Sequence, residues 1–173
     1  MYTDILQKVF MLISDICAIM LVAMAEASHL RNKGVAMNNI LFFLTPKALC
    51  AFVYDDYTVR QALEKMESAG YAALPILNKR GEYRGTLTEG DLLWALKNMC
   101  YMDMRQAEAR RIMEITRRKD NVPVRVTADM KDLVQRASSQ NFVPVVDDKD
   151  AFIGIITRRA IINYCSQQFF AEN

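Results

Sequence analysis

The chain contains the same short sequence pattern twice. Residues 72–77 read AALPIL and residues 85–88 read GTLT, with a polar turn between them. Residues 141–146 read NFVPVV and residues 154–157 read GIIT, again with a polar turn between them. The proline, the glycine and the threonine of the second copy each lie 69 positions after those of the first. A repeat in one register indicates that the chain is built from two copies of one structural unit.

Both copies also have the same order of predicted elements. A short apolar strand at residues 51–54 or 123–126 precedes a polar turn and a helix with apolar residues at helical spacing. The proline strand, a second strand and a last helix follow. We therefore predict two β-α-β-β-α repeats, at residues 40–100 and 122–166, joined by residues 101–121. A unit of about 60 residues cannot bury both faces of its own sheet, so the repeats should pack through their sheets into an α+β body.

The composition is that of an ordinary globular protein. The chain has 173 residues, 52% of them hydrophobic, and a net charge of +2, which argues against a protein that coats nucleic acid or anionic lipid. His29 is the only histidine, and no two cysteines have a metal-binding spacing, which argues against zinc sites and histidine-dependent triads. We expect core thiols in the reducing cytoplasm, and neither a metal nor a cofactor. The cysteines are Cys17, Cys50, Cys100 and Cys165.

Residues 1–36 differ from the rest of the chain. Residues 9–25 read VFMLISDICAIMLVAMA, a run at the short limit for a membrane span, with Asp15 near its middle. Charged residues recur on one face, which favours an amphipathic helical extension over a span. The run ends in a signal-peptidase-like Ala-Met-Ala but lacks a clearly basic segment before it, so we do not expect secretion. A further interpretation stays open, in which Met37 is the native start and the extension is not part of the protein.

The repeated pattern of an apolar-Pro-apolar-apolar strand, a polar turn, Gly-x-x-Thr and a helix resembles the cystathionine-β-synthase-type (CBS) domain. The resemblance spans roughly residues 40–164. Two CBS domains in tandem form a Bateman module, which commonly binds adenine nucleotides in clefts between the copies and dimerises into a flat disc. The resemblance therefore implies a regulatory module, a homodimer and an effector protein of unknown identity. Trp94, on the last helix of the first copy, is a candidate anchor for the dimer contact.

The first copy contains the family's ribose motif, Gly-apolar-x-Thr/Ser-x-x-Asp/Asn, at residues 85–91. The resemblance implies that Asp91 accepts the ribose hydroxyls and that Thr88 bonds the phosphate or the sugar. Backbone N–H groups at the start of the following helix also favour an anion. The alternative is that Thr88 and Asp91 only cap this helix, since Asp is a good capping residue.

The second copy departs from the ribose motif because Ala160 stands where the carboxylate is expected. Thr157 is followed instead by Arg158 and Arg159, at the predicted start of a helix. Cations are disfavoured at this end of a helix, so two arginines there suggest that an anion binds. The alternative is that both arginines are solvated surface residues.

This Thr-Arg-Arg sequence is similar to that of small stand-alone bacterial CBS-pair proteins that bind cyclic di-AMP. Ala72 stands where those proteins have a hydroxyl residue, which puts cyclic di-AMP in doubt relative to AMP, ADP or ATP. The resemblance implies that six further residues line the nucleotide site: Lys47, Ala48, Leu49, Ala72, Ala73 and Pro75.

The segment between the repeats, residues 104–121, is locally basic. It has no aromatic residue that could stack on a base, and acidic residues lie among its arginines. We therefore predict a solvated connecting helix and no nucleic-acid partner.

The function predicted from the sequence is that of a regulatory module that senses an adenine nucleotide or cyclic di-AMP and signals to a partner protein. We expect no enzymatic activity, because the sequence shows no nucleophile–base pair, metal cluster or glycine-rich phosphate loop. The alternative is a structural or interaction module with an empty cleft, an interpretation that Ala160 keeps open.

Overall fold

The computed structural model describes residues 39–98 and 109–171. The chain divides into two compact units, Met1–Met37 and Asn38–Asn173, and the described residues belong to the second. The predicted N-terminal extension therefore lies outside the described residues. Within the two described ranges, no helix combines the length and the apolar character needed to cross a membrane.

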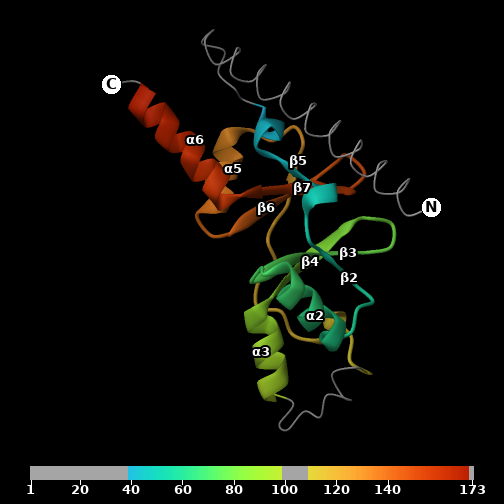
Figure 1. The fold of residues 1–173 in the computed structure, drawn as a ribbon. Coiled ribbons are helices and arrows are strands. Elements are labelled where there is room, and N and C mark those ends of the chain that lie inside the picture. Colours follow the sequence, from blue (N-terminus) through green and yellow to red (C-terminus); the bar gives the residue numbers. More distant parts are fainter. Residues whose placement is uncertain (1–38, 99–108, 172–173) are drawn as a thin grey trace, which may run out of the picture. The chain divides into compact units, whose positions relative to one another are not determined.

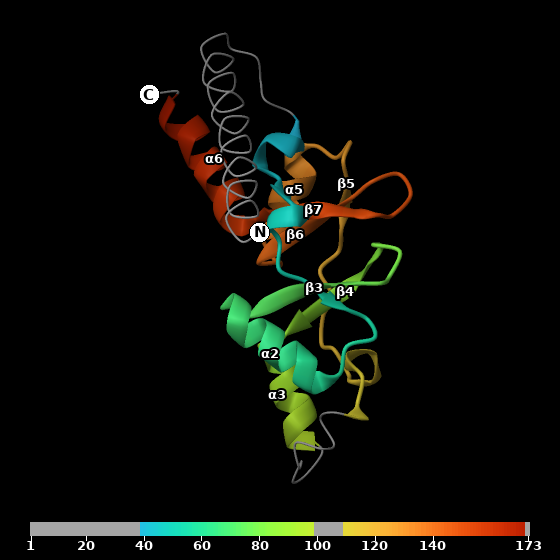
Figure 2. The same cartoon turned by 45° about the vertical axis from the view of Figure 1, so that its right-hand side comes forward.

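Two sheets of like design form the described unit (Figure 1). The sheet of the first repeat has the order β2-β3-β4, and helices α2 and α3 lie beside it (Figure 2). The sheet of the second repeat contains β5, β6 and β7, with helices α5 and α6 beside it. The bounds in the first repeat are β2 Val53–Tyr54, α2 Val59–Ala69, β3 Ala73–Leu77, β4 Tyr83–Thr88 and α3 Glu89–Asn98. Those in the second are β5 Val124–Arg125, α5 Met130–Ala137, β6 Phe142–Val146, β7 Phe152–Thr157 and α6 Arg158–Ala171. The predicted α+β class with two β-α-β-β-α repeats is confirmed.

The strand pairing is the same in both repeats. The first strand runs parallel to the proline strand, with Val53 opposite Ile76 in one repeat and Val124 opposite Val145 in the other. The proline strand and the strand that follows it are antiparallel in each repeat. Each sheet buries one apolar cluster against its own helices.

Helix ends are set by local sequence. Thr58 and Gln61 form a reciprocal capping box at the start of α2, and Gly70 ends that helix in the left-handed conformation at φ +67°. Asp129 caps α5 by accepting from the Asp132 N–H group at 2.9 Å.

The segment that leads into each repeat packs on the opposite repeat. Strand β1, Thr45–Pro46, pairs antiparallel with β7, so the second sheet has the order β1-β7-β6-β5. Ile40 begins the short 3-10 helix η1, Ile40–Phe43, and is fully buried in the core of the second repeat. A side chain at Gly154 would clash with the backbone carbonyl of Thr45, so only glycine permits β1 to approach β7 this closely.

The corresponding segment before the second repeat corrects part of a prediction. Residues 101–121 were expected to form a solvated connecting helix. Residues 101–108 lie outside the described residues and Ala109 is helical, whereas the only helical turn within residues 110–121 is the 3-10 turn η3, Ile112–Glu114. The reason is that Ile112 and Ile115 are buried in the core of the first repeat. This burial fixes the segment against the protein and leaves it no regular helical face.

The two repeats also contact each other through their hairpins. The Phe152 N–H group donates to the Gly81 carbonyl at 2.9 Å, and Glu82 forms an isolated bridge with Ala151. The rings of Tyr83 and Phe152 stack with their centroids 6.2 Å apart. The predicted packing of the repeats through their sheets therefore brings β4 and β7 together.

Candidate functional site

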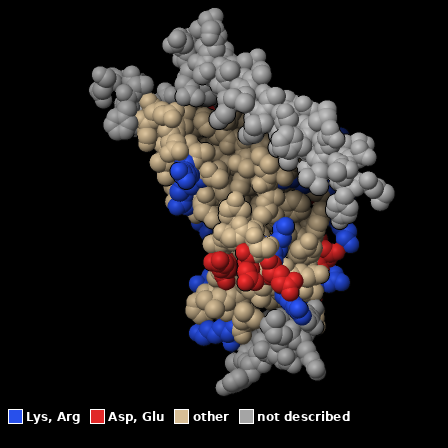
Figure 3. Space-filling model, in the orientation of Figure 1, with Lys and Arg blue, Asp and Glu red and all other residues tan. Residues whose placement is uncertain are grey.

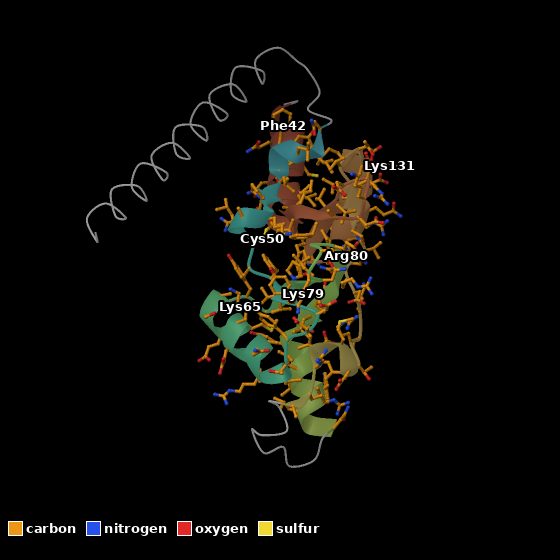
Figure 4. All side chains as sticks on the ribbon, turned by 90° about the vertical axis from the view of Figure 1, so that its right-hand side faces the viewer. Phe42, Cys50, Lys65, Lys79, Arg80 and Lys131 are labelled. Carbon is orange, nitrogen blue, oxygen red and sulfur yellow. The ribbon has the colours of Figure 1, made fainter. Side chains whose placement is uncertain are left out.

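A cavity of about 260 Å³ lies between the two repeats, and we call it the open cleft. Its walls come from three parts of the chain: residues 45 and 49–51, residues 71–75, and the second-repeat residues 141, 142, 155 and 157. In Figure 4, Cys50 marks the first of these walls, at a level between Phe42 and Lys65. Both repeats therefore contribute to this cleft.

The open cleft is mainly apolar and is exposed at its rim. Ala73, Pro75 and Ile155 provide small or flat apolar surface. Tyr71 and Leu49 lie at the rim, with 58% and 61% of their surface exposed. A cleft with this lining suits a flat ring system whose polar groups meet only a few partners.

One wall of the open cleft has backbone groups that the sheet does not use. The Asp55 N–H group donates to the Leu77 carbonyl at 2.9 Å, which sets the parallel ladder between β2 and β3. In that register the next donor opposite the Ala51 carbonyl would be the backbone nitrogen of Pro75, and proline has no N–H group. The ladder therefore ends before Ala51, a residue that lines the cleft.

The far end of the open cleft is the start of helix α6. Thr157 lines the cleft as the last residue of β7, and its Oγ1 accepts from the Ala160 N–H group at 3.2 Å. The Arg158 Nε donates to the Gln140 carbonyl at 2.8 Å, and Arg159 is exposed. The first turn of α6 has these two arginines and no acidic residue. It therefore lacks the negative charge that normally stabilises a helix start.

The equivalent positions on the other side of the repeat pair form what we call the closed cleft, defined by Thr88, Asp91, Asn121, Val122 and Gln140. Asp91 is 2% exposed, and both of its oxygens accept hydrogen bonds. Its Oδ2 accepts from the N–H and hydroxyl groups of Thr88 at 3.0 and 2.7 Å. Its Oδ1 accepts from the Arg118 N–H group at 3.0 Å. This carboxylate therefore joins the start of α3 to the segment between the repeats.

Gln140 fills the part of the closed cleft next to Val122. It is 3% exposed, its Oε1 accepts from the Val122 N–H group at 2.9 Å, and its Nε2 donates to the Val122 carbonyl at 3.2 Å. Asn121, 7% exposed, donates from Nδ2 to the Phe142 carbonyl at 2.9 Å. The side-chain carboxamides of Gln140 and Asn121 therefore form hydrogen bonds with backbone groups in this cleft.

A hydrogen-bonded network seals the closed cleft further. The Tyr83 hydroxyl donates to the Asn121 carbonyl at 2.8 Å and lies 2.7 Å from the Thr86 hydroxyl. Burial raises the pKa of Tyr83 well above its ordinary value. The Thr86 N–H group donates to the Asp120 carboxylate at 2.9 Å, and Arg117 pairs with that carboxylate at 3.2 Å.

The structure places the eleven predicted site residues in four groups. Five of them line the open cleft: Leu49, Ala72, Ala73, Pro75 and Thr157. Arg158 and Arg159 begin the helix next to it, and Thr88 and Asp91 belong to the closed cleft. Lys47 and Ala48 lie in the 3-10 helix η2, Lys47–Leu49, outside the lining. The Lys47 Nζ lies 5.9 Å from the centroid of the Phe52 ring, beside the β3–β4 turn at Gly81.

Sequence reasoning did not single out the other residues of the open cleft, namely Thr45, Cys50, Ala51, Tyr71, Leu74, Asn141, Phe142 and Ile155. Cys50 donates from Sγ to the Thr45 carbonyl at 3.3 Å, and burial raises the pKa of its thiol. The 69-residue register could have pointed to Ile155, two residues before Thr157. No signal in the sequence showed that Thr45 joins the opposite sheet.

Basic side chains and potential metal ligands are distributed over the part of the chain that the structure describes. The face in Figure 3 has its Lys and Arg in separate groups, with Asp and Glu between them, and not as a continuous basic surface. Within residues 39–98 and 109–171, no cluster of His, Cys, Asp and Glu has the arrangement of a metal site.

Comparison with known proteins identifies the repeats. The sequence model of the CBS domain matches residues 46–98 and 112–167, whereas no curated protein matches the chain. Among solved structures, a CBS domain protein from Streptococcus pneumoniae TIGR4 is similar at 22% identity and a TM-score of 0.66, covering 74% of this chain and 86% of its own. The CbpB protein of Listeria monocytogenes in complex with c-di-AMP has 19% identity and a TM-score of 0.67, covering 78% and 99%. CBSX2 in complex with AMP has 22% identity and a TM-score of 0.60, covering 75% and 97%. The chain belongs to the CBS-domain family, with two CBS domains in tandem.

Proposed function

We propose that this protein is a regulatory module that binds an adenine nucleotide in the open cleft and transmits its occupancy to a partner protein. The observation that carries the proposal is an apolar cavity shared by both repeats, with unused backbone groups at one end and a basic helix start at the other. Solved proteins of similar fold were crystallised with c-di-AMP and with AMP, which supports the same class of ligand here.

The adenine ring would lie between the apolar residues of the cleft, against Ala51. The Watson–Crick edge of adenine has an acceptor nitrogen beside an amino donor. The N–H and carbonyl groups of Ala51 offer the complementary donor and acceptor where Pro75 ends the β2–β3 ladder. Ala73 and Ile155 supply the apolar surface that the ring faces require.

The phosphate would lie at the start of α6. The Thr157 hydroxyl and the first backbone N–H groups of the helix can donate to phosphate oxygens. Arg158 and Arg159 add positive charge and bidentate donors. A bound phosphate also compensates the unfavourable position of two cations at the positive end of a helix.

The identity of the ligand depends on the missing ribose carboxylate. Ala160 cannot accept hydrogen bonds from a free ribose diol, so a ligand whose 3′ oxygen is esterified to phosphate loses no contact here. This feature favours cyclic di-AMP, whereas the absence of a hydroxyl at Ala72 favours AMP, ADP or ATP. Both classes share the adenine and phosphate chemistry described above.

The proposed regulation of a partner protein depends on a cleft that both repeats line. A ligand that contacts both repeats stabilises one arrangement of the pair over others, and a partner that recognises this arrangement then responds to the ligand. The apolar face of α3 provides surface for the homodimer that we propose, with Leu93 62% exposed.

Isothermal titration calorimetry with AMP, ATP, S-adenosylmethionine and cyclic di-AMP tests the proposal. We expect wild type to bind at least one adenine nucleotide, and Arg159→Gln to bind it at least fivefold more weakly. Lys131→Gln removes one exposed positive charge on α5, away from the cleft lining, and should bind like wild type. A folded wild type that binds none of the four ligands would contradict the proposal. That result would favour the alternative that Ala160 supports, a structural module with an empty cleft.

A further inference from the structure

The closed cleft repeats the backbone arrangement of the open cleft around a different residue. Val122 precedes β5 as Ala51 precedes β2, and both first strands pair in the same register with the strand that contains the proline. Pro144 has no N–H group, so the ladder between β5 and β6 also ends before the Val122 carbonyl. The Val122 carbonyl is therefore outside the ladder as the Ala51 carbonyl is, and the Val122 N–H group bonds a side chain instead of the ladder.

In the closed cleft these two groups are already bonded. A carboxamide carries one acceptor oxygen and one donor nitrogen on adjacent positions. Gln140 uses both atoms, accepting from the Val122 N–H group at 2.9 Å and donating to the Val122 carbonyl at 3.2 Å. This is the donor and acceptor pattern with which an adenine edge would meet the same backbone. Gln140 is buried in this position, with only 3% of the residue exposed.

A second intramolecular contact occupies the other end of the closed cleft. The Arg118 N–H group donates to Asp91 Oδ1 at 3.0 Å, the carboxylate that the sequence motif assigns to the ribose. Asp91 therefore has the partners it needs without a ligand.

The open cleft has a different residue at the position equivalent to Gln140. Tyr71 lies 69 positions before Gln140 and is 58% exposed at the rim. The side chain of tyrosine has no carboxamide, so Tyr71 cannot bond both the N–H and the carbonyl group of Ala51 as Gln140 bonds those of Val122. The two clefts thus have the same backbone, but only the closed one has an internal group that satisfies it.

We propose that Gln140 is a built-in occupant of the adenine subsite in the closed cleft, so that each chain offers one adenine site instead of two. The proposal rests on the proposed function for the identity of the ligand. It assigns to the closed cleft an adenine subsite that is accessible only when the Gln140 carboxamide is removed.

The amide resonances of Ala51 and Val122 in ¹⁵N–¹H NMR spectra report on the two clefts separately. AMP at saturating concentration is the probe. We expect AMP to shift the Ala51 resonance and leave the Val122 resonance unchanged in wild type. In Gln140→Ala, AMP should shift both resonances, and calorimetry should show the stoichiometry rise from one to two per chain. Tyr71→Ala is the matched control at the equivalent position, and its Val122 resonance should not respond.

A Val122 resonance that moves in wild type, or that stays unchanged in folded Gln140→Ala, would overturn the inference. Gln140→Asn gives a second test with a smaller perturbation, because its shorter side chain keeps the carboxamide but cannot reach both groups of Val122. It should bind AMP in the closed cleft more weakly than Gln140→Ala does. Failure of the proposed function gives a different result, in which neither AMP nor cyclic di-AMP moves the Ala51 resonance of wild type.

Discussion

The open and closed clefts have the same backbone arrangement, but their side chains differ in charge and in hydrogen bonding. The helix that starts at the closed cleft has Glu89 and Asp91 in its first turn, whereas the helix that starts at the open cleft has Arg158 and Arg159. The closed cleft is filled by hydrogen-bonded side chains, whereas the open cleft is a cavity with small apolar walls. The difference shows that two copies of one fold can differ in whether internal side chains fill the equivalent cleft.

The largest expected effect is on stability, from Asp91→Ala. This change removes the buried acceptor of two partly buried donors, the Arg118 N–H group and the Thr88 hydroxyl. Hydrogen bonds to charged groups contribute about 1.5–3 kcal/mol each, so we expect a loss of about 3 kcal/mol in the free energy of unfolding. Urea denaturation measures it.

Asp129→Ala is the control for that experiment. Asp129 only caps α5 from an exposed position, and loss of such a cap costs about 1 kcal/mol. Equal losses for the two variants would mean that Asp91 is only a helix cap, and that it does not hold the segment between the repeats.

Gln140→Ala and Tyr71→Ala compare the two clefts at equivalent positions. Gln140→Ala leaves the N–H and carbonyl groups of Val122 without their partner, so we expect a loss of about 2 kcal/mol. Tyr71 is 58% exposed, so Tyr71→Ala should change stability by about 0.5 kcal/mol or less in the absence of ligand. Thermal and urea denaturation of both variants measure the contrast, which disappears if the two residues have similar structural roles.

Ala160→Asp introduces a carboxylate at the position that the sequence motif assigns to the ribose contact, three residues after Thr157 of the open cleft. A charge-assisted pair of hydrogen bonds to a free ribose diol should tighten the binding of AMP by about tenfold, or about 1.4 kcal/mol. Cyclic di-AMP, whose 3′ oxygen is esterified, should not gain and should bind more weakly because of the added negative charge. Calorimetry with both ligands measures the two changes. Unchanged affinity for both would show that position 160 does not face the bound ligand.

Tyr83→Phe tests the sealing network through its pH dependence. The folded-state pKa of Tyr83 is raised above the ordinary value of 10.0, chiefly by burial. The folded state therefore resists ionisation, and stability falls as the pH rises above about 10, because only the unfolded chain releases this proton. Tyr83→Phe should cost about 1 kcal/mol at pH 7, for the bond to the Asn121 carbonyl, and should reduce the alkaline loss. Urea denaturation from pH 7 to 11 tests this. An alkaline loss as large as in wild type would assign it to other groups.

The repeated architecture could be predicted from the sequence, because both proline strands lie in one 69-residue register with the apolar pattern that buries them. The packing of the segment before each repeat on the opposite repeat could not be predicted. Strand β1 has only two residues, too few for any periodicity, and Ile112 and Ile115 pack on a core that precedes them in the chain. The sequence around these residues does not indicate that they pack on the opposite repeat.

The candidate site was predictable only in part, for a related reason. The motif identified Asp91 as a residue of special chemistry, and its partner Arg118 lies 27 positions away. Gln140 and Val122 are likewise 18 positions apart, in a pairing that depends on the packing of two repeats. A sequence motif shows which residues can bind a ligand, whereas three-dimensional packing decides which of them are already occupied.

The most direct test of the account is a crystal structure of the protein grown with saturating AMP. We predict electron density for one adenine per chain, in the open cleft against the backbone of Ala51, with phosphate near Arg158 and Arg159. Asp91 and Gln140 should keep their intramolecular partners in the same crystal. Nucleotide density against Asp91 in the closed cleft, with the open cleft empty, would contradict the account.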